Sequence, residues 1–175
     1  MGITSWEANA NYAASVTLQT PSAATRTYIT NSTLTQPSTK FQIGARLKWR
    51  LNLTKTATGT ASSTFEVCFG TAGTTADTAR LSFTKPAGTA AADEGFIEID
   101  CIVRGPISAS CIVTGSFRLV HNLSATGHST VPAVVLNAQS AAFDITAASV
   151  AGLAVSPGAA DVYTIQQVDG GLSNV

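Results

Sequence analysis

Charged residues are scarce in this sequence, and their signs cancel. Only 11% of the 175 residues are charged, with ten Lys or Arg against ten Asp or Glu, whereas a soluble domain commonly carries about 25%. These scattered charges give no basic surface for nucleic acid, so we expect no nucleic-acid partner. A protein without net charge associates readily, which favours a subunit of a packed assembly. The alternative is a neutral monomer that its many hydroxyl groups keep soluble.

Long apolar runs are missing as well. No stretch approaches the roughly 18 apolar residues of a membrane span, so we expect no membrane partner. The first residues, Met1 to Glu7, hold neither the basic nor the apolar segment of a signal peptide. We therefore expect synthesis and folding in a cytoplasm.

Residue types that carry metal or thiol chemistry are few and badly spaced. The cysteines are Cys68, Cys101 and Cys111, and the histidines are His121 and His128. None of them forms a CxxC pair or another metal-ligand spacing, so we predict no metal site. We expect free thiols packed as small hydrophobic groups, with a Cys101–Cys111 bridge as the alternative under oxidising conditions. We expect His121 to be a half-buried, hydrogen-bonded histidine.

Catalytic motifs are also absent. The pair Asp93-Glu94 precedes an apolar run, and we expect both carboxylates to be solvated in a loop. The sequence has no Gly-x-Ser-x-Gly elbow, phosphate-binding loop or dinucleotide fingerprint. We therefore predict that the chain is not an enzyme, with no catalytic residue and no cofactor.

What the sequence does contain is strict alternation of apolar and polar residues. From Phe41 to Leu53 every second residue is apolar, and Arg46, Lys48 and Arg50 stand between them. Side chains of a strand point to opposite faces with a period of two, so this run predicts a long strand with a bulge or bend at Gly44. Other predicted strands cover residues 15–19, 26–30, 65–69, 79–83, 97–103, 111–119, 133–136, 142–146 and 161–168.

Short strands separated by Gly, Pro, Asn and Ser are typical of a sandwich or barrel. We predict an all-β, antiparallel, jelly-roll-like β-sandwich over residues 14–175, preceded by an extended N-terminal arm over residues 1–13. The arm contains Trp6 and Tyr12, and aromatic residues are common interface anchors. We therefore name Trp6 and Tyr12 as candidate partner-binding residues. The alternative is an arm folded back over its own sandwich.

The cations Arg46, Lys48 and Arg50 complete the set of candidate partner-binding residues. Because they share one face of one strand, they offer a positive stripe to an acidic neighbour or a phosphate. The alternative, which we favour, is a solvated outer face whose cations discourage pairing at a sheet edge.

Three stretches resemble virion proteins of tailed bacteriophages. They are Phe65 to Ala79, Thr114 to Gly127, and the closing Tyr163-Thr164-Ile165-Gln166-Gln167-Val168. The resemblance implies a jelly-roll-like domain in a virion, made in the host cytoplasm, and it brings no active-site residues. It further implies a capsid decoration (cement) protein that binds the major capsid protein or other virion proteins and stabilises the shell, often as a homotrimer.

Two alternatives stay open beside the decoration protein. The first is a tail fibre, spike or appendage domain that binds a host glycan through exposed aromatic residues such as Trp6 and Tyr12, with Trp49 in the core. The second is a depolymerase-like enzyme, which the absence of clustered acidic residues disfavours.

Overall fold

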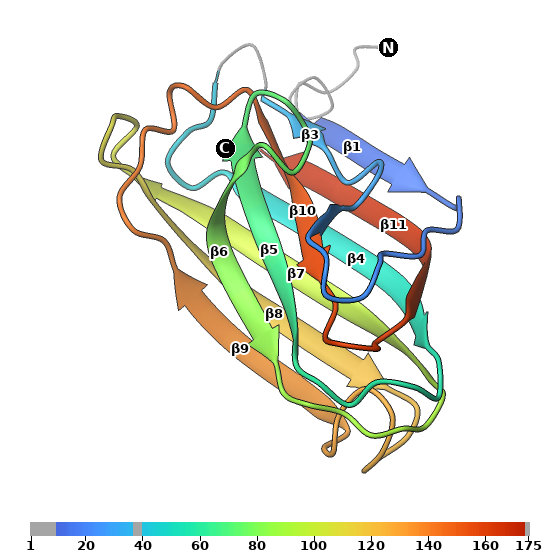
Figure 1. The fold of residues 1–175 in the computed structure, drawn as a ribbon. Coiled ribbons are helices and arrows are strands. Elements are labelled where there is room, and N and C mark those ends of the chain that lie inside the picture. Colours follow the sequence, from blue (N-terminus) through green and yellow to red (C-terminus); the bar gives the residue numbers. More distant parts are fainter. Residues whose placement is uncertain (1–9, 37–39, 174–175) are drawn as a thin grey trace, which may run out of the picture.

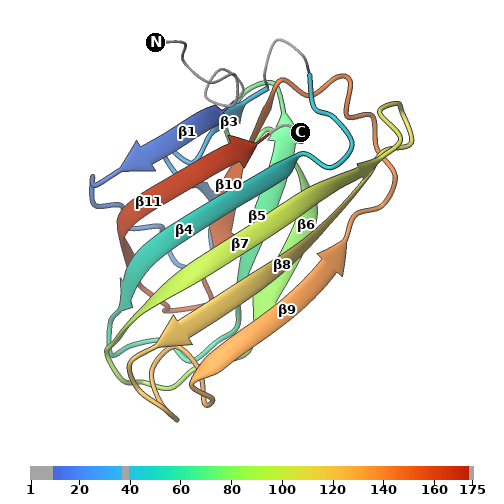
Figure 2. The ribbon, with the colours of Figure 1, turned by 180° about the vertical axis from the view of Figure 1, so that it is seen from behind.

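The protein is built from two antiparallel β-sheets that pack face to face (Figures 1 and 2). The computed structural model describes residues 10–36 and 40–173, and the regular structure within those residues is entirely β-strand. The strands are β1 (Ala10–Ser15), β2 (Thr27–Tyr28), β3 (Leu34–Thr35), β4 (Arg46–Lys55), β5 (Ser63–Gly70), β6 (Thr78–Lys85), β7 (Asp93–Gly105), β8 (Ile112–His121), β9 (Ala133–Gln139), β10 (Val150–Ser156) and β11 (Tyr163–Ser173).

The strand pairing is nested, which confirms the predicted jelly-roll-like sandwich. The six-stranded sheet has the order β1-β11-β4-β7-β8-β9, and the five-stranded sheet has the order β2-β10-β5-β6 with β3 also on β10. The outermost strands in sequence pair with each other (β1 with β11), then β2 with β10, β4 with β7, and β5 with β6. The hairpin strands β8 and β9 extend the first sheet beyond β7. The chain therefore alternates between the two layers.

Alternation creates the core. On β4 the buried apolar side chains are Leu47, Trp49, Leu51 and Leu53, and the positions between them face outwards. Trp49 is in the core as expected, and its indole Nε1 donates a hydrogen bond of 2.7 Å to the Ser32 carbonyl oxygen. Burying one face of each sheet against the other removes the apolar side chains from water, which is the main favourable term in folding.

Several strand boundaries differ from the expected ones. Residues 10–13, which we assigned to the arm, belong to β1, and residues 1–9 lie outside the described part of the chain. The strand expected from Phe41 begins only at Arg46, because the chain turns at Gly44, whose φ is 89°. The bend expected at Gly44 is confirmed, since a positive φ suits a residue without a Cβ.

Three further differences concern short or apolar segments. The expected strand at residues 142–146 is reduced to one bridge between Cys111 and Phe143. The expected strand at residues 15–19 is reduced to the end of β1 and one bridge between Gln19 and Ile165, and the one at residues 26–30 to β2, which pairs with β10. Strand β10 was missed altogether, because nearly all of its residues are buried and the sequence therefore shows no polar alternation there.

Candidate binding surface

The predicted cations lie on the outer face of the six-stranded sheet, which is the face turned away from the other sheet (Figure 2). Arg46, Lys48 and Arg50 are all exposed on β4. Strand β4 lies between β11 and β7, so it is not an edge strand. The reading of these cations as protection of a sheet edge is therefore wrong.

Carboxylates on the neighbouring strand face these cations. Arg46 Nη2 lies 2.9 Å and Lys48 Nζ 3.5 Å from Asp100 Oδ2. Arg50 Nη1 lies 3.6 Å from Glu98 Oε1, and the other oxygen of Glu98 lies 3.5 Å from Arg118 Nη1 on β8. The face is therefore a network of opposite charges rather than a positive stripe.

The charges form rows because the strands are in register. One row runs Asp169, Arg50, Glu98, Arg118 across β11, β4, β7 and β8. The Arg50 guanidinium also lies 4.4 Å from the centroid of the Phe96 ring, a cation–π contact. We did not single out Glu98, Asp100, Arg118 or Asp169 in the sequence. The signal was present, since Glu98, Asp100 and Arg118 are the polar members of alternating runs.

Tyr12 stands at the edge of this face, on β1, and 72% of it is exposed. Its cross-strand neighbour is Gly171 on β11. A Cβ built on Gly171 would lie 3.6 Å from Cδ1 and Cε1 of the Tyr12 ring. The tyrosine ring therefore stands beside a position without a side chain. The other predicted aromatic anchor, Trp6, lies outside the described residues.

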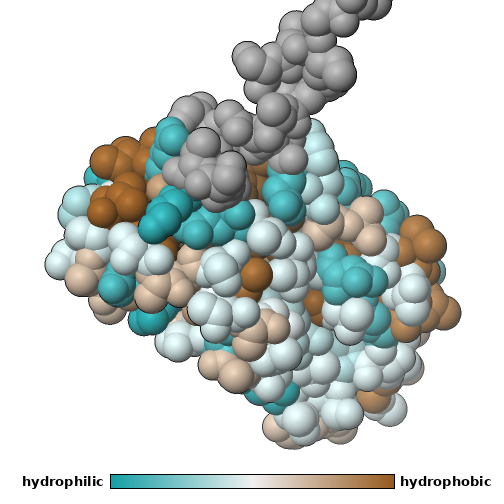
Figure 3. All heavy atoms as spheres, turned by 90° about the horizontal axis from the view of Figure 1, so that it is seen from above, coloured by the Kyte–Doolittle hydropathy of each residue, from teal (hydrophilic) through white to brown (hydrophobic). Residues whose placement is uncertain are grey.

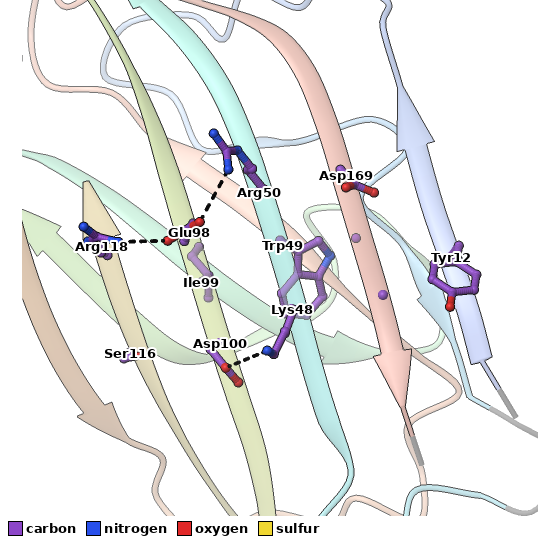
Figure 4. A pocket seen from close by; sticks show the side chains of 12 residues that line it. Tyr12, Lys48, Trp49, Arg50, Glu98, Ile99, Asp100, Ser116, Arg118 and Asp169 are labelled. Carbon is purple, nitrogen blue, oxygen red and sulfur yellow. Dashed lines mark hydrogen bonds and ion pairs between the residues drawn. The ribbon is translucent and has the colours of Figure 1, made fainter. Parts of the chain in front are cut away.

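A cleft of about 530 Å³ opens between Tyr12 and the charged rows (Figure 4). In Figure 4, Tyr12 lies on one side, the side chains of β4, β7 and β8 lie on the other, and Asp169 lies between them. A second hollow of about 470 Å³ adjoins it and shares Asp100 and Ser116 with it. The cleft is lined by Tyr12, Lys48, Trp49, Arg50, Glu98, Ile99, Asp100, Ser116, Arg118, Asp169, Gly170 and Gly171.

The β1 edge is a second exposed feature. Within the described residues β1 pairs only with β11, so its other main-chain edge is open. The chain continues from β1 into Val16 and Leu18, which are 82% and 67% exposed. We call the open edge of β1 together with Val16 and Leu18 the β1 edge surface.

Viewed from above in Figure 3, hydrophobic residues gather at two opposite ends of the molecule, with paler and hydrophilic residues over most of the side between them.

Polar side chains also gather inside the molecule, at one end of the sandwich. We call this group the polar end cluster. Its members are the buried residues Lys55, Ser63, Lys85, Asp93, His121, His128, Asp161 and Tyr163. They come from the ends of β4, β6 and β8 and the beginnings of β5, β7 and β11, together with two adjoining loops.

Asp93 and His121 form the tightest contact of the polar end cluster. His121 Nδ1 lies 2.6 Å from Asp93 Oδ2, and His121 Nε2 lies 2.7 Å from the Val131 carbonyl oxygen. Burial would raise the pKa of Asp93, but hydrogen bonds from the His128 N–H, from His121 and from the Leu123 N–H lower it below its usual value. The expected solvated loop pair is therefore wrong for Asp93, whereas Glu94 is exposed.

The rest of the polar end cluster is held by hydrogen bonds to protein groups. The Ser63 hydroxyl lies 2.9 Å from Asp161 Oδ2 and 2.8 Å from the Tyr163 hydroxyl. The Lys55 ammonium donates to the Thr56 and Thr89 carbonyl oxygens, and the Lys85 ammonium to those of Pro86 and His128. These contacts tie loops to strand ends, which is a structural role.

Two members of the polar end cluster, Asp161 and His128, carry buried polar atoms without a hydrogen-bond partner, and only His128 has no side-chain hydrogen bond at all. His128 is fully buried, and its ring stacks on Tyr163 with centroids 5.8 Å apart, yet neither ring nitrogen has a hydrogen-bond partner. Burial lowers the pKa of His128 to about 4, and burial also lowers that of Lys85 to about 8. His128 is therefore held as a neutral ring at neutral pH.

Cys68, Cys101 and Cys111 are buried free thiols, as expected. Over residues 10–36 and 40–173, no group of three or more His, Cys, Asp or Glu side chains is placed to hold a metal ion. The same residues contain no helix of the length and hydropathy that a membrane span requires.

Comparisons with known proteins found distant structural likenesses. No protein-family model matches the sequence, and no curated protein matches it. The CBM2 module of the evolved Dit of Lactobacillus casei BL23 phage J-1 is similar at a TM-score of 0.35 and 10% identity, over 82% of this chain and 68% of that chain. Arcelin-5, a lectin-like defense protein from Phaseolus vulgaris, is similar at a TM-score of 0.35 and 5% identity, over 95% of this chain and 100% of that chain. Both likenesses are too distant to bear on function.

Proposed function

We propose that this chain is a structural protein of a virus particle that works by binding the major capsid protein, as a capsid decoration protein. The proposal joins the sequence resemblance to tailed-phage virion proteins with one structural observation, the β1 edge surface. We propose a binding protein and not an enzyme; the buried titratable groups of the polar end cluster line neither hollow of the outer face.

The β1 edge surface supports binding to another protein for two reasons. An open strand edge carries unpaired N–H and C=O groups that can add a strand from another chain. Monomeric proteins usually cover such edges or place charged residues there, but here the strand runs into exposed Val16 and Leu18. A neighbouring subunit that covered these two side chains would remove apolar surface from water.

The test is incorporation into particles. The double variant Val16→Lys, Leu18→Lys should keep its fold, because both side chains are exposed, but it should be lost from purified particles, as measured by quantitative mass spectrometry. The matched control is Val135→Lys, which changes a residue that is 62% exposed on β9 at the opposite sheet edge. Incorporation of the double variant at the wild-type level would contradict the proposal.

Location and shell stability test the decoration role itself. Electron microscopy of particles carrying a labelled copy should place it on the capsid, in groups of three if the expected homotrimer forms. Capsids that lack the protein should open at lower temperature, because a ligand that binds only the intact shell stabilises it. A label on the tail alone would favour the second candidate instead.

The second candidate is a tail fibre, spike or appendage module. The cleft beside Tyr12 favours it, because a concave site with an aromatic wall and converging polar groups suits a small ligand.

A further inference from the structure

We infer that the cleft on the outer face of the six-stranded sheet binds a neutral saccharide chain, with Tyr12 as the stacking platform. This goes beyond the proposed role in a virion and does not depend on the part of the particle that carries the chain.

The platform is formed by Tyr12 and Gly171. A sugar ring has apolar C–H faces that pack on an aromatic ring, and hydroxyls at its rim that need hydrogen bonds. The exposed Tyr12 ring stands at one wall of the cleft, and Gly171 beside it leaves the neighbouring floor without a side chain. A flat ligand can therefore lie against the tyrosine without displacing protein atoms.

The charged rows provide both hydrogen-bond donors and hydrogen-bond acceptors. In the row Asp169, Arg50, Glu98, Arg118, carboxylates alternate with guanidinium groups. A sugar hydroxyl both donates and accepts hydrogen bonds, so it is satisfied between an Asp or Glu oxygen and an Arg N–H. The Arg50–Glu98 and Arg118–Glu98 pairs are 3.6 and 3.5 Å long, and their side chains are about half exposed. Their N–H groups and carboxylate oxygens can therefore form further hydrogen bonds to a ligand.

The charge balance selects a neutral ligand. The two hollows are lined by four cations, Arg46, Lys48, Arg50 and Arg118, and by three carboxylates, Glu98, Asp100 and Asp169. All four cations already face a carboxylate of the same surface. A polyanion such as nucleic acid or a sulfated polysaccharide requires uncompensated cations, and it would also meet the three carboxylates.

The length of the site suits a chain rather than a single sugar. The cleft and the second hollow share Asp100 and Ser116, so together they run from Tyr12 on β1 to Asn137 on β9. Six strands spaced about 4.8 Å apart span roughly 24 Å. An oligosaccharide laid across the strands, with one unit on Tyr12, would contact successive members of the rows.

The experiment is a binding screen with cleft variants. The whole chain is applied to an array of neutral oligosaccharides of glucose, galactose, mannose, rhamnose and N-acetylhexosamines, together with a heparin oligosaccharide and a single-stranded oligonucleotide. We expect binding to at least one neutral glycan. Tyr12→Ala should weaken it about tenfold or more, the size of one aromatic contact, and Tyr12→Phe should keep it within about twofold. Gly171→Val should block it by filling the floor, since the strand conformation there tolerates a side chain.

Other outcomes overturn the inference. They are the absence of binding to any neutral glycan, stronger binding to the heparin oligosaccharide or the oligonucleotide, or equal affinity of Tyr12→Ala and the wild type. The matched control is the double variant Val16→Lys, Leu18→Lys, which lies outside the cleft and should bind glycan normally. The same pair of variants separates the two proposals, because Tyr12→Ala should still enter particles even where it has lost the glycan.

Discussion

The carboxylate of Asp93 and the imidazole of His121 lie 2.6 Å apart, Oδ2 to Nδ1, and neither side chain has any exposed surface. Asp93 also accepts hydrogen bonds from the main-chain N–H groups of Glu94, Leu123 and His128, at 2.9, 3.2 and 3.1 Å. One carboxylate at the start of β7 therefore holds the end of β8 and the loop that follows it.

We predict that Asp93→Ala lowers the free energy of unfolding by about 3 to 5 kcal/mol, since each buried group left without its hydrogen-bond partner costs about 1 to 3 kcal/mol and Asp93 is the partner of several. The loss arises because His121 and the N–H groups of Leu123 and His128 would stay buried without their acceptor. Urea denaturation followed by circular dichroism measures it. Glu94→Ala, an exposed neighbour, should change the same quantity by less than about 0.5 kcal/mol, and equal effects of the two substitutions would contradict this reading.

The burial of part of the polar end cluster can be predicted from the sequence. The alternation that places Leu47, Trp49, Leu51 and Leu53 inside the sandwich continues to Lys55, which is buried as well. The same parity leads from Phe83 to Lys85 and from Leu119 to His121, and of these three polar residues we expect only His121 to be partly buried. Alternation therefore predicts that these polar side chains point inwards. It does not predict their hydrogen-bond partners, because these depend on which strand ends meet in the nested topology.

For the charged rows and for Tyr12, too, the sequence predicts which side chains are exposed, but not which residues lie beside them. Alternation puts Arg46, Lys48 and Arg50 on the outer face, but only strand register shows that Glu98 and Asp100 lie opposite them. Tyr12 was selected as an aromatic residue in a polar segment, and it is indeed exposed. Its place beside Gly171 required the pairing of β1 with β11, the two described strands furthest apart in sequence. Contacts of that range follow from the whole fold and not from local pattern.

We predict that stability falls between about pH 6.5 and about pH 4 because of His128. Burial lowers its pKa to about 4; the nearby Asp93 opposes this, and Lys85, His121 and Lys55 add to it. Between these pH values the unfolded chain binds a proton that the folded chain excludes. The contribution of neutral His128 to the free energy of unfolding is therefore fully present above about pH 6.5 and is lost as pH falls through about 4. The loss should reach up to about 3 kcal/mol.

His128→Phe isolates this effect. The phenyl ring keeps the stacking on Tyr163, and no hydrogen bond of the imidazole is lost, because neither of its nitrogens has a partner. The variant should therefore be at least as stable as the wild type at pH 7, and its free energy of unfolding should decline less towards pH 4. Parallel pH profiles of the two proteins would show that His128 is not the titrating group.

A single carboxylate shapes the loop between β5 and β6. Asp77 is buried, and its two oxygens accept hydrogen bonds from the N–H groups of Thr71, Ala72 and Gly73 at 3.1, 3.0 and 2.7 Å. Asp77→Ala should cost about 1 to 3 kcal/mol, because these donors would lose their acceptor. Faster amide hydrogen exchange at residues 71–73 in the variant is the direct measurement. Unchanged exchange there would mean that the loop holds its shape without Asp77.

The charged rows of the outer face should behave differently from the buried pair of Asp93 and His121. Glu98 faces both Arg50 and Arg118, but all three side chains are substantially exposed, and exposed ion pairs contribute about 0 to 1 kcal/mol. Glu98→Gln should therefore lower the free energy of unfolding by less than about 1 kcal/mol, and high salt should abolish the difference. A loss of several kcal/mol that persists in high salt would show that the row holds the sheet together, and that Arg50 and Arg118 are not available to a ligand.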